Sequence, residues 1–113
     1  KAKHPEPYVS QTLAPSSVLC GDFNFDVSDP QHRLLHGAAR GGLNYRDAWV
    51  TCYPGRQHDL TCGLYDHVQW SDGADCRDFI FVSEDLTSRV RHVAVDGKTD
   101  ASDHQPMMIE LAD

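Results

Sequence analysis

Long hydrophobic runs are absent from this chain of 113 residues. No apolar stretch approaches the roughly 20 residues that a membrane-spanning helix needs, so no membrane span is expected. A signal peptide is not apparent either, because the chain begins with the polar, proline-containing segment 1–7.

Cysteine pairs of the CxxC type are also lacking, although the chain contains four cysteines. Their irregular spacing is unlike that of common zinc motifs, and it favours reduced, partly buried thiols. A cytoplasmic location is favoured because a cytosolic protein with reduced thiols is the default for such cysteines. A zinc-binding interaction domain stays an alternative, because histidines lie between the last three cysteines. Its ligands would be Cys52, Cys62 and Cys76 with His58 or His67.

Positive charge is scarce: ten Lys and Arg stand against 17 Asp and Glu, for a net charge of −7. Such a chain has no general affinity for nucleic-acid phosphates, and its arginines are scattered among acidic residues. A divalent cation held by carboxylates can nevertheless bring a phosphate to an acidic surface. The charge therefore does not exclude a phosphate-containing substrate.

The length suits one domain, which we predict to be α+β and to span residues 17–113 after a proline-containing lead-in at 1–16. A helix is expected from Pro30, with Asp29 as its N-cap, because Leu34, Leu35, Ala38 and Ala39 follow at helical spacing. Gly41-Gly42 would end this helix. The other predicted elements are a buried strand at 17–21, a short helix at 45–50, a weak strand at 59–64, and strands at 79–83, 90–95 and 107–111. We expect the strand at 90–95 to pair with 79–83.

The segment Gly21–Asn24 follows the first predicted strand directly. Glycine lets the backbone turn sharply at this point. We expect Asp22 and Asn24 to share one side of the chain and Phe23 to point into the core. A polar loop stabilised by Asx hydrogen bonds is the alternative.

A second polar group precedes the last predicted strand, in the segment 102–106 with the sequence SDHQP. Its Asp103 could bind a hard metal ion, and its His104 could contact a phosphate oxygen. Asp78 opens an earlier strand and could orient His104 if the two segments are neighbours. Loop hydrogen bonds to the backbone, and a strand-end cap for Asp78, are the alternatives.

The three motifs GDFN, RDFIFVS and SDHQP, in this order over residues 17–111, resemble the endonuclease/exonuclease/phosphatase superfamily. The resemblance implies hydrolysis of a phosphoester by in-line attack of water, with Mg²⁺ or Mn²⁺ as cofactor. It also implies the following roles: Asp22 activates or positions the water, Asn24 holds the scissile phosphate, His104 stabilises a phosphate oxygen, Asp78 pairs with His104, and Asp103 contributes to the metal site.

The resemblance covers only the second half of the family's fold, a four-layer sandwich like that of DNase I. Nothing before Gly21 matches the asparagine and metal-binding glutamate of the first half, since Glu6 lies in a proline-rich context. We therefore expect one mostly antiparallel sheet with helices on one face. The other face would be exposed and would bind the missing N-terminal half or a second copy of the chain. The fragment alone should have little activity, because Asp103 alone is a poor magnesium site.

The substrate stays open between a nucleic acid and a small-molecule or lipid phosphodiester. The order Asp75-Cys76-Arg77-Asp78 does not support the inositol-polyphosphate 5-phosphatase branch, which typically has Trp-Cys-Asp-Arg there. The segment 51–77 corresponds to the family's substrate-reading loops. A non-catalytic binding module that keeps the fold is the remaining alternative.

Overall fold

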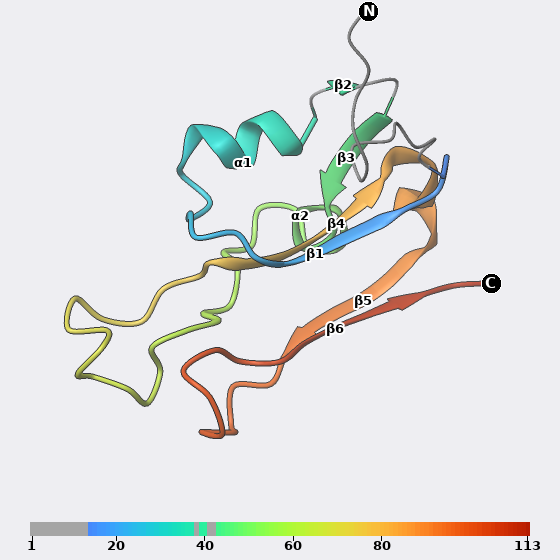
Figure 1. The fold of residues 1–113 in the computed structure, drawn as a ribbon. Coiled ribbons are helices and arrows are strands. Elements are labelled where there is room, and N and C mark those ends of the chain that lie inside the picture. Colours follow the sequence, from blue (N-terminus) through green and yellow to red (C-terminus); the bar gives the residue numbers. More distant parts are fainter. Residues whose placement is uncertain (1–13, 38, 41–42) are drawn as a thin grey trace, which may run out of the picture.

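The computed structural model describes residues 14–37, 39–40 and 43–113, and it shows an α+β fold with two antiparallel sheets (Figure 1). The predicted lead-in at 1–16 lies mostly outside the described residues. The larger sheet has the spatial order β1 (Val18–Asp22), β4 (Asp78–Ser83), β3 (Leu43–Asp47) and β2 (Ala39–Arg40), and the smaller one pairs β5 (Val90–Val95) with β6 (Met107–Leu111). The helices are α1 (Pro30–Leu35), α2 (Ala48–Cys52) and the 3₁₀ helix η1 (Glu84–Arg89).

Strand β4 forms the centre of the hydrophobic core, and its side chains alternate between two buried faces. Phe79 and Phe81 pack on one face with Phe23, Phe25 and Leu35, the last of which belongs to α1. The other two apolar residues of β4, Ile80 and Val82, pack on the opposite face with α2 and the β5–β6 hairpin. Because both faces are covered, the strand is a continuous apolar run instead of an alternating one. The predicted inward orientation of Phe23 is confirmed.

The first helix starts as predicted but is shorter than predicted. Asp29 is its N-cap residue and Pro30 its first residue, yet the helix ends at Leu35. His36 then forms a bridge with Tyr45, and Ala39 belongs to β2 instead of the helix. A helix of this length is marginal by itself, so pairing with the segment that follows decides where it ends. Ala38 and the predicted stop at Gly41-Gly42 lie outside the described residues.

The predicted helix at 45–50 is wrong in its first half. Tyr45, Arg46 and Asp47 pair with β4 as part of β3, and α2 begins only at Ala48. The Asp47 carboxylate accepts a hydrogen bond from the Trp49 N–H at 2.8 Å, and this contact caps the helix. Trp49 packs inward as expected, because it is almost fully buried.

The partner predicted for the strand at 90–95 is also wrong. Strand β4 already pairs with β1 on one edge and β3 on the other, and a strand has only two edges. Strand β5 therefore pairs with β6, with Val93 opposite Ile109. The resulting hairpin packs against Ile80 and Val82. The structure thus has two sheets instead of one, and its hairpin covers part of the face that we expected to be exposed.

Helices lie on both faces of β4, in contrast to the expected single helical face. α1 reaches the Phe79 and Phe81 side through Leu35, whereas α2 reaches the Ile80 and Val82 side through Ala48 and Trp49. In Figure 1, α1 lies above the large sheet and the β5–β6 hairpin lies below it.

Strand β1 lies at the edge of the large sheet, and all five of its residues are exposed. This result contradicts the buried strand that its apolar run predicted, because only β4 pairs with it among the described residues. The weak strand expected at 59–64 is reduced to isolated bridges of Cys62 with Asp75 and with His104. Within the described residues, no helix has the length and hydropathy that a membrane crossing needs.

Candidate active site

Two antiparallel strands bring the first two predicted site residues together. In the pairing of β1 with β4, Asp22 lies directly opposite Asp78, because the end of one strand meets the start of the other. We call this end of the larger sheet, where Asp22 and Asp78 lie, the rim. His104 reaches the rim through the bridge between its backbone and Cys62. The long loops before β4 and β6 extend from this end of the two sheets (Figure 1).

His104 lies between two carboxylates. Its Nδ1 is 2.8 Å from Oδ2 and 3.1 Å from Oδ1 of Asp78, and its Nε2 is 3.6 Å from Oδ2 of Asp22. The side chain of Asp78 is 15% exposed, whereas those of His104 and Asp22 are 28% and 39% exposed. One side of the imidazole is therefore held in place, and the other faces an accessible carboxylate.

The electrostatic surroundings favour the protonated form of His104. Burial by itself would lower the pKa of this imidazole. The hydrogen bond and charge of Asp78, together with the charges of Asp22 and Asp103, outweigh burial and raise the pKa above its ordinary value. An imidazolium at this position can donate a hydrogen bond to an anionic oxygen.

Thr61 orients Asp78, and sequence reasoning missed it. Its hydroxyl donates to Asp78 Oδ2 at 2.7 Å and accepts the backbone N–H groups of Arg77 and Asp78 at 3.0 and 3.2 Å. Its carbonyl accepts the Gln105 N–H at 2.6 Å, so this fully buried residue joins both segments of the site. Thr61 lies in an irregular loop, and no sequence pattern there indicates that its hydroxyl would contact Asp78.

Asp103 precedes the histidine in the chain, and among the described residues its carboxylate is not part of a group of three possible metal ligands. Its Oδ2 accepts a hydrogen bond from Trp70 Nε1 at 3.2 Å, and its carbonyl accepts the Gly63 N–H at 2.9 Å. A Cβ on Gly63 would lie 2.7 Å from the Trp70 ring, and its φ of 76° is left-handed, so only glycine fits. Trp70, which meets the His104 ring edge-on, belongs to the segment 51–77, which the sequence identified as a possible binding loop.

Asn24 continues the turn after Asp22 with a left-handed φ of 57°. Its backbone N–H donates to Asp22 Oδ1 at 2.9 Å, which is the Asx contact that the sequence left open. Its carbonyl accepts from Arg77 Nη1 at 3.1 Å. Asn24 lies at the same end of the sheet as Asp22. Among the described residues, however, no hydrogen bond joins its side-chain amide to Asp78 or His104.

The donor set is incomplete for magnesium. Within the described part of the chain, the one group of three metal-ligating side chains comprises Cys62, Asp78 and His104, whose ligand atoms lie within 4.8 Å of one another. Magnesium requires about six oxygen ligands, and Asp103 is outside this group. The described residues therefore do not form a magnesium site by themselves.

The alternative zinc cluster of Cys52, Cys62 and Cys76 does not form such a group among the described residues. The cysteines are free. Burial raises the pKa of the Cys76 thiol to about 12, and burial with the charges of Asp78 and Asp75 raises that of Cys62 to about 11. Both thiols are therefore protonated near neutral pH.

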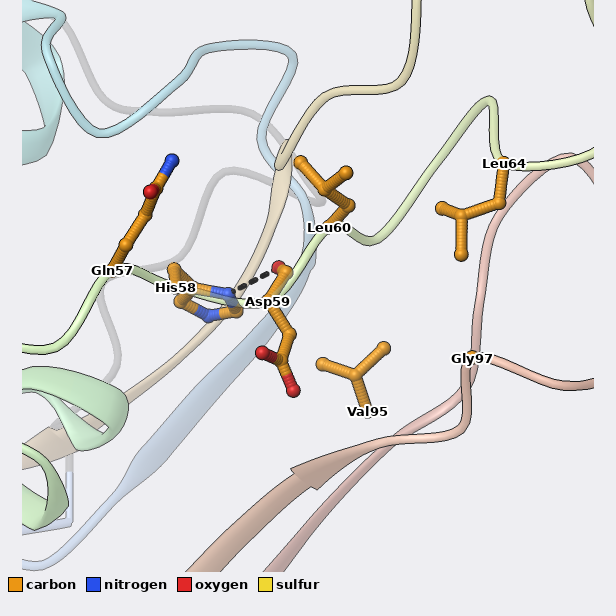
Figure 2. A pocket seen from close by; sticks show the side chains of 7 residues that line it. All are labelled: Gln57, His58, Asp59, Leu60, Leu64, Val95 and Gly97. Carbon is orange, nitrogen blue, oxygen red and sulfur yellow. Dashed lines mark hydrogen bonds between the residues drawn. The ribbon is translucent and has the colours of Figure 1, made fainter.

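Cavities lie along the segment 57–64 and near the candidate site. Figure 2 shows one of about 440 Å³, with His58 and Asp59 at one side and Leu60, Leu64 and Val95 around it. Of the candidate site residues, His58 of the zinc alternative lines this cavity, whereas Asp22, Asn24, Asp78, Asp103 and His104 do not. Two others adjoin the site: one of about 220 Å³ touches Asp78 and Gln105, and one of about 440 Å³ touches Trp70 and Arg77. These two cavities therefore lie beside Asp78 and Trp70, which both contact His104.

A histidine held between two carboxylates can accept and donate protons in acid–base chemistry. A family model for the endonuclease/exonuclease/phosphatase family matches residues 8–104. The chain belongs to this family, whose members are in general phosphoester hydrolases. A search of curated proteins gave no match.

Proposed function

We propose that the chain forms the histidine-bearing part of a phosphoester hydrolase that uses a water molecule as the nucleophile. The single observation that carries the proposal is the placement of His104, whose Nδ1 bonds to Asp78 while its Nε2 lies 3.6 Å from Asp22. A substrate phosphate at the rim would meet both the imidazole and the Asp22 carboxylate.

The proposed chemistry divides the work between these side chains. Asp22 positions or activates the attacking water, and Asn24 holds the scissile phosphate from the turn beside it. His104 donates a hydrogen bond to a phosphoryl oxygen as negative charge grows on it, and Asp78 keeps the ring oriented and protonated. Positioned groups of this kind typically contribute about 10²–10⁴-fold in rate.

Mg²⁺ or Mn²⁺ is the proposed cofactor, and it would neutralise charge on the phosphate. Asp103 would contribute one oxygen, and a preceding segment would supply the others. The chain would then be the C-terminal half of a four-layer sandwich and would have little activity alone. Its N-terminal half, or a second copy, would cover the apolar side chains that β1 exposes, Val18 and Leu19.

The substrate is proposed only as a phosphoester of a nucleic acid, a small molecule or a lipid. Arg77 is a cation beside the rim: it contacts Asn24 and Asp75 and lies 5.8 Å from the centre of the Trp70 ring. This isolated arrangement of a cation and an aromatic ring fits a single phosphate and an adjoining planar or apolar group equally well.

The test joins this chain to the segment encoded before Lys1, which should contain a glutamate on a core strand. The protein is assayed with Mg²⁺ against DNA, RNA, a lipid phosphodiester and bis(p-nitrophenyl) phosphate. We expect hydrolysis of at least one substrate, loss of activity with EDTA, and loss in His104→Ala. A folded, metal-loaded protein that hydrolyses none of them would favour the non-catalytic binding module instead.

A further inference from the structure

The thiol of Cys62 lies beside the Asp78–His104 pair, and the proposed hydrolysis does not use it. One ligand atom from each of these three residues falls within 4.8 Å of the others. Cys62 is fully buried, its backbone bridges to both Asp75 and His104, and its Sγ–H donates to the Asp75 carbonyl at 3.3 Å. The thiol is therefore held at a fixed position by its neighbours.

The chemistry of these donors selects a different class of metal from magnesium. A thiolate, an imidazole and a carboxylate together suit borderline or soft ions such as Zn²⁺ and Co²⁺. Tetrahedral zinc with bond lengths of about 2.0–2.3 Å places its ligand atoms roughly 3.3–3.7 Å apart. Side-chain movements of about 1 Å would thus close the site, and a fourth position would remain for water or a phosphate oxygen.

Partners outside the triad already orient two of the three ligands. The Thr61 hydroxyl donates to Asp78 Oδ2, which fixes that carboxylate. Trp70 packs edge-on against the His104 ring. Outer contacts of this kind raise the affinity of a metal site because the ligands need not be ordered on binding. His104 is partly exposed, so an ion can enter from its side.

We propose that Cys62, Asp78 and His104 form a binding site for a thiophilic divalent cation of the Zn²⁺ class, and that occupation of this site inhibits the enzyme. Binding forms a metal–sulfur and a metal–nitrogen bond, and it releases the thiol proton and one proton of the imidazolium to solvent. The ion competes with the hydrogen bond between Asp78 and His104, which removes the imidazolium from catalysis. The inhibition rests on the proposed function, whereas the binding does not.

The test measures binding to the 113-residue chain without substrate. Co²⁺ serves as the probe, because a cobalt–thiolate bond gives a charge-transfer band in the near ultraviolet, and Zn²⁺ is then titrated in competition. We expect one ion per chain. Cys62→Ser should remove the band and weaken binding more than about 100-fold, since loss of outer partners alone costs about 10–100-fold.

Matched controls use the other thiols. Cys20→Ser, on the exposed edge strand, and Cys52→Ser, on α2, should leave the band and the affinity unchanged. His104→Ala should weaken binding as well. Because His104 is only partly buried, this variant is suitable if Cys62→Ser does not fold, as judged by circular dichroism. The proposal would be overturned if the native chain gave no cobalt–thiolate band. It would also be overturned if the band survived in Cys62→Ser or, where that variant does not fold, in His104→Ala.

Discussion

Among the described residues, two histidine–aspartate pairs have the same contact distance and very different surroundings. His32 Nε2 lies 2.8 Å from Asp47 Oδ2, and His104 Nδ1 lies 2.8 Å from Asp78 Oδ2. The side chains of the first pair are only 5% and 1% exposed, whereas those of the second are 28% and 15% exposed.

The buried pair is surrounded by structural contacts. The His32 ring lies 5.1 and 5.6 Å from the ring centres of Phe79 and Phe81. Its partner Asp47 also caps α2 through the Trp49 N–H. A substrate has no access to such a pair, so its contribution is to stability.

The rim pair leaves one nitrogen of the imidazole available. His104 Nε2 faces Asp22 across 3.6 Å, a distance that is longer than a hydrogen bond and leaves the nitrogen open to a phosphate oxygen. The comparison teaches that the pair alone does not define a site. Exposure of the second ring nitrogen, beside another carboxylate, distinguishes the candidate catalytic pair from the structural one.

Replacement of the rim histidine should give the largest effect. In a polypeptide that contains the remaining metal ligands, His104→Gln should lower kcat/KM by about 10²–10⁴-fold. Glutamine keeps a donor toward Asp78 but cannot carry the proton. Steady-state phosphodiester hydrolysis measures the loss, and urea unfolding should show nearly native stability. Retained activity would contradict a catalytic role for this imidazole.

Disruption of the buried pair should affect stability instead. Asp47→Ala leaves His32 buried without its partner and removes the cap of α2, so we expect a loss of about 3–5 kcal/mol in the free energy of unfolding. Urea denaturation with linear extrapolation measures it. Asp78→Ala is the matched control and should cost less, because solvent can reach His104. Equal losses in the two variants would remove the distinction between the pairs.

Thr61 should matter to the rim pair in two measurable ways. Thr61→Val leaves the N–H groups of Arg77 and Asp78 without their buried acceptor, which should cost about 1–3 kcal/mol of stability. It also frees the Asp78 carboxylate and should lower kcat more than it changes KM. Thr61→Ser retains the hydroxyl and should restore both. A serine variant as impaired as the valine variant would show that packing of the methyl group dominates.

The smallest expected effect is a pair of opposite pH dependences. The raised pKa of His104 means that its stabilisation is complete below about pH 6.5 and is lost as the pH rises through the raised value. The Nδ1 atom of His36 accepts a hydrogen bond from the Asp47 N–H. Burial lowers the pKa of His36, and the charges of His32 and Arg46 lower it further, whereas the charge of Asp47 raises it. Its contribution is therefore present above about pH 6.5 and is lost as the pH falls through the lowered value.

Urea unfolding of the native chain, His104→Gln and His36→Gln between about pH 5 and pH 8 separates the two contributions. The stability advantage of the native chain over His104→Gln should shrink as the pH rises. The advantage over His36→Gln should shrink as the pH falls. Slopes of the same sign would contradict the assigned pKa directions.

Part of the fold could be predicted from short-range patterns. The start of α1 at Asp29-Pro30, the strand β6 and most of β4 follow from local preferences, and the structure has them. The end of α1, the strand character of Tyr45–Asp47 and the partner of β5 could not be predicted in this way. Each depends on which distant segment is available for pairing, and strand preference depends strongly on such context.

The candidate site divides in the same way. Asp22, Asp78, Asp103 and His104 belong to motifs that are visible in the sequence. The register that sets Asp22 opposite Asp78 belongs to the three-dimensional structure, as does the contact of Asp103 with Trp70. The hydroxyl of Thr61 could not be identified from an irregular loop, because its role depends on a partner 17 positions away.

By itself, the sequence determined the family of this protein and the chemical groups that it can bring to a phosphate. Only the tertiary structure decided that one histidine–aspartate pair is buried and the other lies at the rim. The physical reason is that the identity of a side chain sets which bonds it can form. Its exposure and its neighbours result from packing between segments far apart along the chain.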